Sequence, residues 1–415
     1  MNKIIYPSQI SGNIQSPSSK SMMQRALCAA LLSNGNSIIK NPTWCNDALA
    51  AKSLSENLGA EIQYHENEVL IKGGLNLKNN ILNCNESGLA IRMFTPVAAL
   101  FNHEITISGH GSLLKRPMNM LEEPLKSLGV QIESNNGYLP LKIKGKLKGG
   151  FAKVDGSVSS QVLTGLLMAL PLAENDSELE VTDLQSKPYI DMTLELLNIF
   201  GISIVNENYQ KFKIKGNQQY KACEYTIEGD WSNTAFLLVA GAIGGELIVN
   251  GLNPKSKQAD VNILNAFHQC NAKLSINQDF IKTSKSNLHG FYFDATHCPD
   301  LFPPLVALAS NCSGISVIRG TNRLIYKESN RAIVLQNEFE KIGIKITLQP
   351  NEMVIYGSKI VGGTASSNND HRIAMALALA GINAENPVVI ENSEAVNKSY
   401  PEFFDDFIKI GGKIK

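Results

Sequence analysis

The stretch LSENLGAEIQYHENEVLIKGG, residues 54–74, decides the fold because the chain repeats its pattern. It has the end of an apolar helix, then Gly59, a short alternating strand, a polar turn and a second strand. A glycine at this place suits a helix end that turns left-handed before the strand begins. The same order recurs around Gly129, Gly201, Asn271 and Gly343, and in shortened form at Gly411.

The spacing of these positions predicts a molecule built from six similar modules. Successive positions lie 70, 72, 70, 72 and 68 residues apart. Such units are too long for a common solenoid and too regular for chance. Each module combines helices with strands, and the alternation along the strands indicates one buried face. The predicted fold class is therefore α/β, made of α+β modules with mixed strand pairing.

The two ends of the chain predict how the modules divide into domains. The sixth module stops just after its first strand begins, and residues 3–10 read as a strand that could supply the missing pairing. That closure brings both chain ends into one half of the molecule. We predict a first three-repeat domain at 14–226 and a second made of 1–13 plus 227–415. The two crossings then lie before Ser16 and within 217–228.

Composition excludes several classes of protein. The chain has 415 residues, with 43% hydrophobic, 18% charged and a formal net charge of zero, which does not favour a nucleic-acid or membrane-surface protein. The N-terminal residues 1–12 lack the pattern of a signal peptide, and no apolar run approaches the length of a membrane span. The seven cysteines are scattered without a CxxC pair, and the histidines show no ligand spacing. We expect a cytoplasmic protein without a structural metal.

The segment SPSSKSMMQRAL, residues 16–27, begins a helix with hydroxyls and two cations. Ser21 and Arg25 are four residues apart and share a helix face. Free backbone N–H groups, the helix dipole, Lys20 and Arg25 together could form an anion pocket. The alternative is an ordinary capped helix whose lysine and arginine are solvated.

Other helix starts carry similar residues. In the first half they are ESGLAIR (86–92) and DGSVSSQ (155–161), with Ser186 before a third helix and Arg116 on a loop; in the second half they are Asp300, KESNR (327–331), DHR (370–372) and Lys398. Gly88 would let a ligand approach the backbone closely. Any one of these is more often a cap or a surface ion pair. If the helices are parallel, however, their N-termini point into one cleft, which favours one or two polyanionic small substrates.

Together these segments identify a family. SKSMMQRAL (19–27), DGSVSSQVLTGLLMALPLA (155–173), SKPYIDMT (186–193), KRPMNML (115–121), CPDLFPPLVALA (298–309), KESNRA (327–332), DHRIAMALALAG (370–381) and KSYPEFF (398–404) resemble the 5-enolpyruvylshikimate-3-phosphate synthases. The resemblance implies two domains of three βαβαββ units each, of the inverse α/β barrel type. It also implies transfer of the enolpyruvyl group of phosphoenolpyruvate to the 5-hydroxyl of shikimate 3-phosphate, without a metal or organic cofactor. We expect a monomer.

The resemblance also implies roles for individual residues. Shikimate 3-phosphate would be held by Lys20, Ser21, Arg25, Ser159, Ser160, Gln161, Ser186, Asp300 and Lys327. Phosphoenolpyruvate would be held by Lys20, Gly88, Arg116, Gln161, Arg331, Arg372 and Lys398. Asp300 and Glu328 match the acid–base carboxylates, and Lys20 could exchange a proton with the bridging oxygen.

One segment departs from the family pattern, which is close to NAGTAMRP where this chain has ESGLAIRM (86–93). Gly88 and Arg92 match, whereas Glu86, Leu89 and Met93 do not, so the shape of the phosphoenolpyruvate pocket and the response to glyphosate are open. Two rival functions also stay open at this point. One is the UDP-N-acetylglucosamine enolpyruvyl transferase, although residues 109–120 lack the cysteine expected of it. The other is a non-catalytic anion-binding relative.

Overall fold

The computed structural model describes residues 1–415, which form two compact units. The first unit is Ser18–Ile227, and the second unit combines Met1–Pro17 with Glu228–Lys415. The sequence placed the boundaries after residues 13 and 226, and the structure has them after Pro17 and Ile227. The first boundary lies later because strand β2 (Ile10–Gln15) pairs along its whole length with β16 (Gly245–Asn250) of the second unit.

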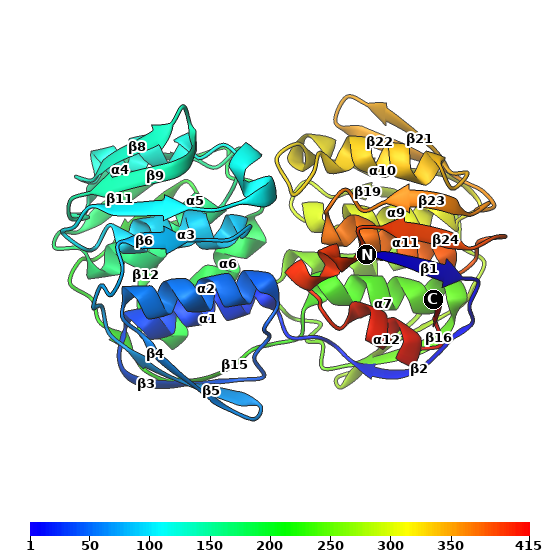
Figure 1. Cartoon of the computed structure of the whole chain (residues 1–415), viewed down its shortest axis with the longest axis horizontal. Coiled ribbons are helices and arrows are strands. Elements are labelled where there is room, and N and C mark those ends of the chain that lie inside the picture. The colour runs from blue at the N-terminus through cyan, green and yellow to red at the C-terminus, as the bar shows by residue number, and fades with distance from the viewer. The chain divides into compact units, whose positions relative to one another are not determined.

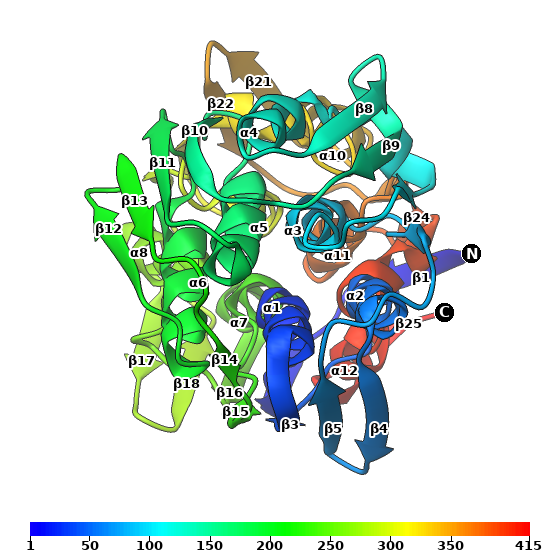
Figure 2. The same cartoon turned by 90° about the vertical axis from the view of Figure 1, so that its left-hand side faces the viewer.

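The first unit contains three sheets (Figures 1 and 2). Their strand orders are β14-β3-β5-β4 (with β15 also on β3), β6-β7-β9-β8 and β10-β11-β13-β12. The strands are β3 (Ser33–Lys40), β4 (Glu61–His65), β5 (Glu68–Gly73), β6 (Ile81–Asn83), β7 (Ile105–Ser108), β8 (Gln131–Asn135), β9 (Tyr138–Lys144), β10 (Gly150–Asp155), β11 (Ser177–Thr182), β12 (Ile204–Glu207), β13 (Lys211–Ile214), β14 (Tyr220–Lys221) and β15 (Glu224–Thr226). The α-helices are α1 (Lys20–Leu32), α2 (Asn46–Leu58), α3 (Gly88–Ala98), α4 (Glu122–Ser127), α5 (Gln161–Ala169) and α6 (Lys187–Ile199).

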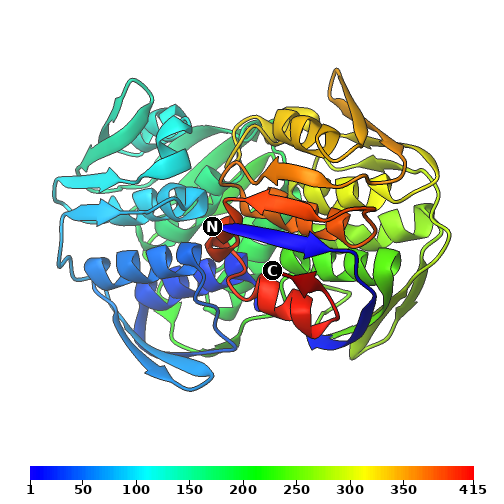
Figure 3. The ribbon, with the colours of Figure 1, turned by 45° about the vertical axis from the view of Figure 1, so that its right-hand side comes forward.

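The second unit also contains three sheets, and the N-terminal strands complete two of them (Figure 3). The strand orders are β17-β18-β16-β2, β19-β20-β22-β21 and β23-β24-β1-β25. The remaining strands are β1 (Asn2–Tyr6), β17 (Lys273–Ile276), β18 (Phe280–Ser284), β19 (Tyr292–Asp294), β20 (Gly314–Arg319), β21 (Lys345–Gln349), β22 (Glu352–Gly357), β23 (Gly363–Ser366), β24 (Val388–Glu391) and β25 (Lys413–Ile414). The α-helices are α7 (Trp231–Gly244), α8 (Ile263–Gln269), α9 (Phe302–Ser310), α10 (Arg331–Glu340), α11 (His371–Gly381) and α12 (Phe403–Lys409).

The six modules predicted from the sequence are confirmed. In the second sheet of the first unit, β6 and β7 are parallel, β9 is antiparallel to β7, and β8 is antiparallel to β9. The other sheets repeat this order. All six repeat positions have positive φ, from 61° at Asn271 to 136° at Gly59. The glycine or asparagine of the sequence pattern therefore marks a left-handed turn after the second helix of each module.

The N-terminal strand supplies the pairing that the sixth module lacks, as predicted. β1 lies between β24 and β25 and is antiparallel to both. The sequence read residues 3–10 as one strand, but the structure ends β1 at Tyr6 and begins β2 at Ile10. Pro7 follows β1 directly, and a proline cannot donate a ladder hydrogen bond. The single predicted strand is thus two strands that serve two different sheets.

One helix of each module is buried on almost every side. These helices are α1, α3 and α5 in the first unit and α7, α9 and α11 in the second. The next strands along the chain after them are β3, β7, β11, β16, β20 and β24, respectively. Figure 2 shows α1, α3 and α5 enclosed by the three sheets of the first unit. Helices apolar all round belong in a core, so their polar N-terminal residues are the exception that points to a site.

Candidate functional site

The N-termini of the three inner helices of the first unit are joined by side-chain hydrogen bonds. Ser87 caps α3 by accepting from the Ala90 N–H, and its hydroxyl donates to Gln24 Oε1 of α1 at 3.0 Å. Arg92 of α3 donates to Gln161 Oε1, at the start of α5, over 2.8 Å. Close packing of α3 on α5 permits this contact, because a Cβ at Gly165 would lie 2.5 Å from the Arg92 carbonyl oxygen. The N-terminal ends of three helix dipoles thus lie near one another.

Two arginines lie against the start of α3, where Gly88 leaves room for them. A Cβ at Gly88 would lie 2.4 Å from Arg116 Nη1 and 3.4 Å from Arg92 Nη1. Arg116 directly follows the 3₁₀ helix η1 (Gly111–Lys115) and is only 5% exposed, unlike an ordinary loop arginine. Glu86, which departs from the family pattern, accepts from the Ser112 backbone N–H at 2.9 Å and from its hydroxyl at 2.8 Å. Glu86 therefore fixes the loop that carries Arg116.

Arg25 is a buried cation in the first unit. Its Nε donates to Thr193 Oγ1 at 3.0 Å, and its two terminal nitrogens donate to the carbonyl oxygens of Ser21 (2.9 Å) and Tyr189 (3.4 Å). Burial lowers the pKa of Arg25 to about 10, so the side chain still carries its charge at neutral pH. None of these partners is a carboxylate. Because an uncompensated buried charge is costly, an anionic ligand would be strongly favoured beside it.

Lys20 has an acidic partner that sequence reasoning missed. Its Nζ lies 2.9 Å from Asp47 Oδ2, and the two side chains are 13% and 7% exposed. Asp47 lies in the first turn of α2, where a carboxylate interacts well with the helix dipole. The only signal in the sequence was this acidic residue at a helix start, which did not indicate its partner 27 residues away.

Three of the four predicted serines lie at the starts of α5 and α6. Ser159 Oγ accepts from the Gln161 backbone N–H at 3.2 Å, and Ser160 is the N-cap residue of α5 with 5% exposure. Ser186 precedes α6 with φ 56° and ψ 44°, a left-handed conformation that is uncommon for a residue with a side chain. Such strain clusters at ligand sites and turns. The residue is 4% exposed.

Arg331 organises the candidate site of the second unit. Its guanidinium contacts three carboxylates: Asp370 Oδ2 from Nε at 2.7 Å, Asp300 Oδ1 from Nη1 at 2.8 Å and Glu328 Oε2 from Nη2 at 2.5 Å. Lys327 Nζ lies 3.1 Å from Asp300 Oδ1, and Arg372 Nη2 lies 3.4 Å from Asp300 Oδ2. We call these six residues the Arg331 cluster; they are Asp300, Lys327, Glu328, Arg331, Asp370 and Arg372. Three acids and three bases balance formally within it.

The Arg331 cluster lies where the three inner helices of the second unit begin. Asp300 is in the 3₁₀ helix η5 (Pro299–Leu301) before α9, while Asp370 caps α11 by accepting from the Arg372 N–H at 3.0 Å. Arg372 Nη1 also donates to the carbonyl oxygens of Asp300 and of Ser232, in the first turn of α7, each at 3.4 Å. Within this unit, the charged residues at the starts of α9, α10 and α11 therefore contact one another.

The charge state of Asp300 is fixed by its neighbours. Burial alone would raise its pKa, but Arg372, Lys327 and Arg331 together hold the pKa of Asp300 well below its ordinary value. Burial lowers the pKa of Lys327, and Asp300 opposes that effect. Asp300 does not cap α9, whose N-cap residue is Leu301, so the carboxylate serves the cluster rather than the helix.

Asp260 is a second buried carboxyl that sequence reasoning missed. It lies in the 3₁₀ helix η4 (Ala259–Asn262), is 1% exposed, and accepts a hydrogen bond from the hydroxyl of Ser232. Burial first, and then the charge of Asp300, raise the pKa of Asp260 to about 7, although Arg372 lowers it. Neighbouring carboxyls whose environments push their pKa values apart are a feature of acid–base sites.

The structure brings most of the predicted residues into groups, but not all. Gly88, Arg116 and Gln161 meet through Arg92, Ser21 meets Arg25, and Asp300, Lys327, Glu328, Arg331 and Arg372 form the Arg331 cluster with Asp370. Lys398 ends the 3₁₀ helix η7 (Ser393–Lys398) and is 8% exposed.

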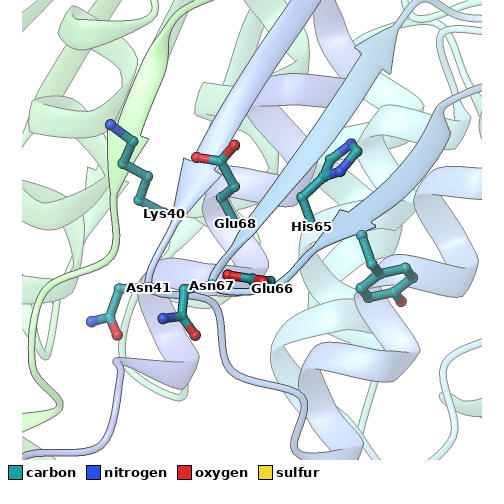
Figure 4. Close-up of a pocket in the computed structure, with 7 residues that line it drawn as sticks. Lys40, Asn41, His65, Glu66, Asn67 and Glu68 are labelled. Atoms are coloured by element: carbon teal, nitrogen blue, oxygen red, sulfur yellow. The ribbon is translucent and has the colours of Figure 1, made fainter.

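A hollow of about 950 Å³ lies elsewhere in the first unit and contains none of the predicted residues. Figure 4 shows Lys40 and Asn41 at the end of β3 and residues 65–68 at the β4–β5 turn, with side chains that do not converge on one point. Lys40 pairs instead with Glu224 of β15 at 2.6 Å. We therefore do not assign a site there. No α-helix of the structure has both the length and the apolar character to cross a membrane.

Comparisons with known proteins give one consistent result. The family model described as EPSP synthase (3-phosphoshikimate 1-carboxyvinyltransferase) matches residues 5–407. A 3-phosphoshikimate 1-carboxyvinyltransferase of Clostridium novyi is 39% identical over 99% of this chain and 97% of its own length, and one of Clostridium kluyveri is 40% identical over the same shares. The EPSP synthase of Acinetobacter baumannii superposes with a TM-score of 0.84 at 25% identity, covering 100% of this chain and 99% of that one. The enolpyruvyl transferase NikO of Streptomyces tendae, at 15% identity and a TM-score of 0.79, shares the fold and covers 100% of this chain and 98% of its own. The chain belongs to the EPSP synthase (3-phosphoshikimate 1-carboxyvinyltransferase) family.

Proposed function

We propose that this protein transfers the enolpyruvyl group of phosphoenolpyruvate to the 5-hydroxyl of shikimate 3-phosphate and releases phosphate. The product lies on the route to chorismate and the aromatic amino acids. The observation that carries the proposal is the match over nearly the whole chain to relatives named 3-phosphoshikimate 1-carboxyvinyltransferase. The chemistry of the two groups of side chains agrees with it.

In the first unit, the proposal assigns anion binding to cations and helix starts. Arg25, with Lys20, Ser21, Ser159, Ser160, Gln161 and Ser186, would hold shikimate 3-phosphate. Arg25 supports this role because its charge lacks a carboxylate partner. Arg116, with Lys20, Gly88 and Gln161, would hold phosphoenolpyruvate, since a planar guanidinium matches a carboxylate or phosphate with paired hydrogen bonds. Arg92 orients Gln161 for this purpose.

In the second unit, the proposal assigns proton transfer to two carboxylates of the Arg331 cluster. The 5-hydroxyl loses a proton as its oxygen bonds to C2 of phosphoenolpyruvate, and C3 gains a proton to become a methyl group. The tetrahedral adduct then loses phosphate as the methyl group returns a proton. Asp300 and Glu328 would share these transfers, with Lys20 as the partner of the bridging oxygen. Lys327 would bind shikimate 3-phosphate together with Asp300.

The low pKa of Asp300 would change when substrate binds. Arg331 and Arg372 are proposed ligands of phosphoenolpyruvate, together with Lys398, and the two arginines also hold Asp300 ionised. An anionic substrate beside them would offset their positive field at the carboxylate. The pKa of Asp300 would then rise toward the range in which it accepts a proton effectively. Substrate binding would thereby switch on the base.

A substrate-comparison assay tests the proposed function. Purified protein is given phosphoenolpyruvate with either shikimate 3-phosphate or UDP-N-acetylglucosamine, and released phosphate is measured. We expect phosphate release when the acceptor is shikimate 3-phosphate and none when it is UDP-N-acetylglucosamine. Release with only the nucleotide sugar would establish the rival enolpyruvyl transferase. Binding of shikimate 3-phosphate without any release would establish a non-catalytic relative.

A further inference from the structure

Two buried cysteines of the second unit lie in contact and belong to no part of the site described above. Cys270 follows α8 and Cys312 follows α9. Each thiol donates to a carbonyl oxygen of its own helix, Cys270 to Phe267 at 3.5 Å and Cys312 to Leu308 at 3.4 Å, and the two side chains lie within hydrogen-bonding reach of each other. Cys270 is 0% exposed and Cys312 is 3% exposed, and neither forms a disulfide in this structure. The pair could not be predicted from the sequence, because 41 residues lie between the two positions.

Backbone hydrogen bonds hold the two cysteines in place. The His289 N–H donates to the Cys270 carbonyl oxygen at 3.0 Å, and His289 forms an isolated parallel bridge with Ser313, next to Cys312. The Ser313 N–H donates to the Leu288 carbonyl oxygen at 2.8 Å, and the Gly290 N–H donates to the Ser313 carbonyl oxygen at 2.9 Å. Residues 288–290 therefore join both cysteine positions from one side, which limits how far the sulfurs can separate.

The pair lies directly below the surface. Gln269 and Asn271, on both sides of Cys270, are exposed, and so are His289 and Ser313. A small oxidant therefore needs only a local opening of the chain to reach the sulfurs. The hydrogen bond with Cys312 lowers the pKa of Cys270 against the opposing effect of burial, whereas it raises the pKa of Cys312. Cys270 is thus the better nucleophile of the two, since the thiolate is the reactive form.

We propose that Cys270 and Cys312 form a reversible oxidation site, which hydrogen peroxide converts to an intramolecular disulfide. The Cys270 thiolate attacks one peroxide oxygen, the O–O bond breaks, and Cys270 becomes a sulfenic acid. The Cys312 sulfur then attacks the Cys270 sulfur, and the hydroxyl group leaves as water. In total, two thiols and one peroxide give one disulfide and two molecules of water.

The disulfide would stabilise the second unit and leave its reaction unchanged. It would close a loop over residues 271–311, which restricts the unfolded chain. The Arg331 cluster lies before α9 whereas Cys312 follows it, and a helix of nine residues is about 14 Å long. The bond would thus join the ends of α8 and α9 that are remote from Asp300.

Peroxide treatment of the full-length protein tests the proposal. After stepwise treatment, free thiols are alkylated under denaturing conditions and the protein is mapped by mass spectrometry. We expect the peptides of Cys270 and Cys312 to be linked, with a mass lower by two hydrogen atoms, and to separate after reduction. The melting temperature should rise by several degrees on oxidation and return on reduction, while turnover is unchanged.

Three variants complete the test. In Cys312→Ser the link should be absent and Cys270 should be trapped as a sulfenic acid by a dimedone probe. In Cys270→Ala, Cys312 should remain a free thiol after peroxide treatment. This second variant tests the proposal if Cys312→Ser folds poorly. Cys298→Ser is the matched control, because Cys298 is equally buried but lies near the carboxylates Asp260, Asp294 and Asp300, and the link should persist in it. Overoxidation of Cys270 in the parent without a link, or labelling of Cys270 and Cys298 to the same extent after peroxide, would overturn the proposal.

Discussion

Asp300 is the residue at which the proposed chemistry and the electrostatics of the second unit meet. Replacement by asparagine keeps the size of the side chain but removes its ability to take a proton. We expect Asp300→Asn to remain folded and to bind shikimate 3-phosphate nearly normally. Its turnover should fall by at least about 100-fold, the usual cost of losing a general acid or base. Steady-state phosphate release and calorimetric binding measure the two quantities.

Asp294→Asn is the control for this substitution. Asp294 lies six residues earlier, at the end of β19, and accepts from the Thr296 backbone N–H at 2.9 Å, so its role is local. It should keep parental turnover. If Asp300→Asn also retained turnover within about threefold, the carboxylate would be structural and the base would have to be Glu328 or His371.

Asp260 makes the free energy of unfolding depend on pH, and its contribution can be measured separately from that of the other titrating groups. Its pKa is raised to about 7 in the folded protein by burial and by Asp300, whereas an unfolded aspartate titrates near 3.9. Between these values the folded state binds more protons than the unfolded state. The stability that Asp260 contributes is therefore fully present below about pH 4 and is lost as pH rises toward 7, by up to about 1.4 kcal/mol for each pH unit.

Asp260→Asn should remove this slope, because an amide does not titrate but still accepts the hydrogen bond from Ser232. Urea unfolding of parent and variant at pH 5 and pH 7.5 gives the comparison, and the difference between the two proteins cancels the other titrating groups, including Asp230, Asp300 and Arg372. Relative to the parent, the variant should gain stability at the higher pH. Parallel pH profiles would show that Asp260 is ionised throughout.

At the scale of elements, Gly88 at the start of α3 leaves the space that the guanidinium of Arg116 occupies. Gly88→Ala should slightly favour the helix, yet its Cβ would lie 2.4 Å from Arg116 Nη1 and displace that guanidinium. We expect the KM for phosphoenolpyruvate to rise at least about tenfold, with the stability of the protein kept, as a charged hydrogen bond is lost. Unchanged kinetics would place Arg116 outside the phosphoenolpyruvate site.

Gly165→Ala in α5 is the matched substitution. There the new Cβ would meet the backbone of α3, 2.5 Å from the Arg92 carbonyl oxygen and 2.9 Å from Met93 Cα. A backbone cannot swing aside as a guanidinium can, so this variant should lose stability by about 1–3 kcal/mol. Denaturant unfolding of the two variants, measured side by side, distinguishes displacement of the Arg116 guanidinium, which keeps stability, from displacement of the helices, which lowers it.

The elements also show what could be predicted from sequence. The modules were predictable because a left-handed helix end is a local requirement, met by glycine at five of the repeat positions and by Asn271 at the remaining one. The charged helix starts were predictable for the same reason. The partners of those charges were not: Asp47 meets Lys20 and Asp370 meets Arg331 across 27 and 39 residues, and only the folded chain brings them together. The exact position of the first boundary between the units was not predicted for the same reason, because β2 belongs to the second unit through its pairing with the distant strand β16.

At the scale of the whole molecule, the two ends of the chain pair in one sheet of the second unit. β1 completes the sheet that the C-terminal module leaves unfinished, and Ile5, 0% exposed, packs against Gly381 of α11. The second unit therefore cannot finish folding without the first residues of the chain, while the sheets of the first unit use only residues 33–226. Damage to β1 should be confined to one unit.

Ile5→Ala tests this asymmetry. Removing a buried isoleucine side chain beyond Cβ should destabilise the second unit by about 2–5 kcal/mol. Hydrogen exchange followed by mass spectrometry should show faster exchange in α9, α11 and β24, with α1, α3 and α5 protected as in the parent. Asn2→Ala, at an exposed position of the same strand, is the control and should leave both units unchanged. Equal loss of protection in α3 and α11 would mean that the two units unfold as one cooperative structure, and that closing the chain at β1 stabilises all six modules rather than three.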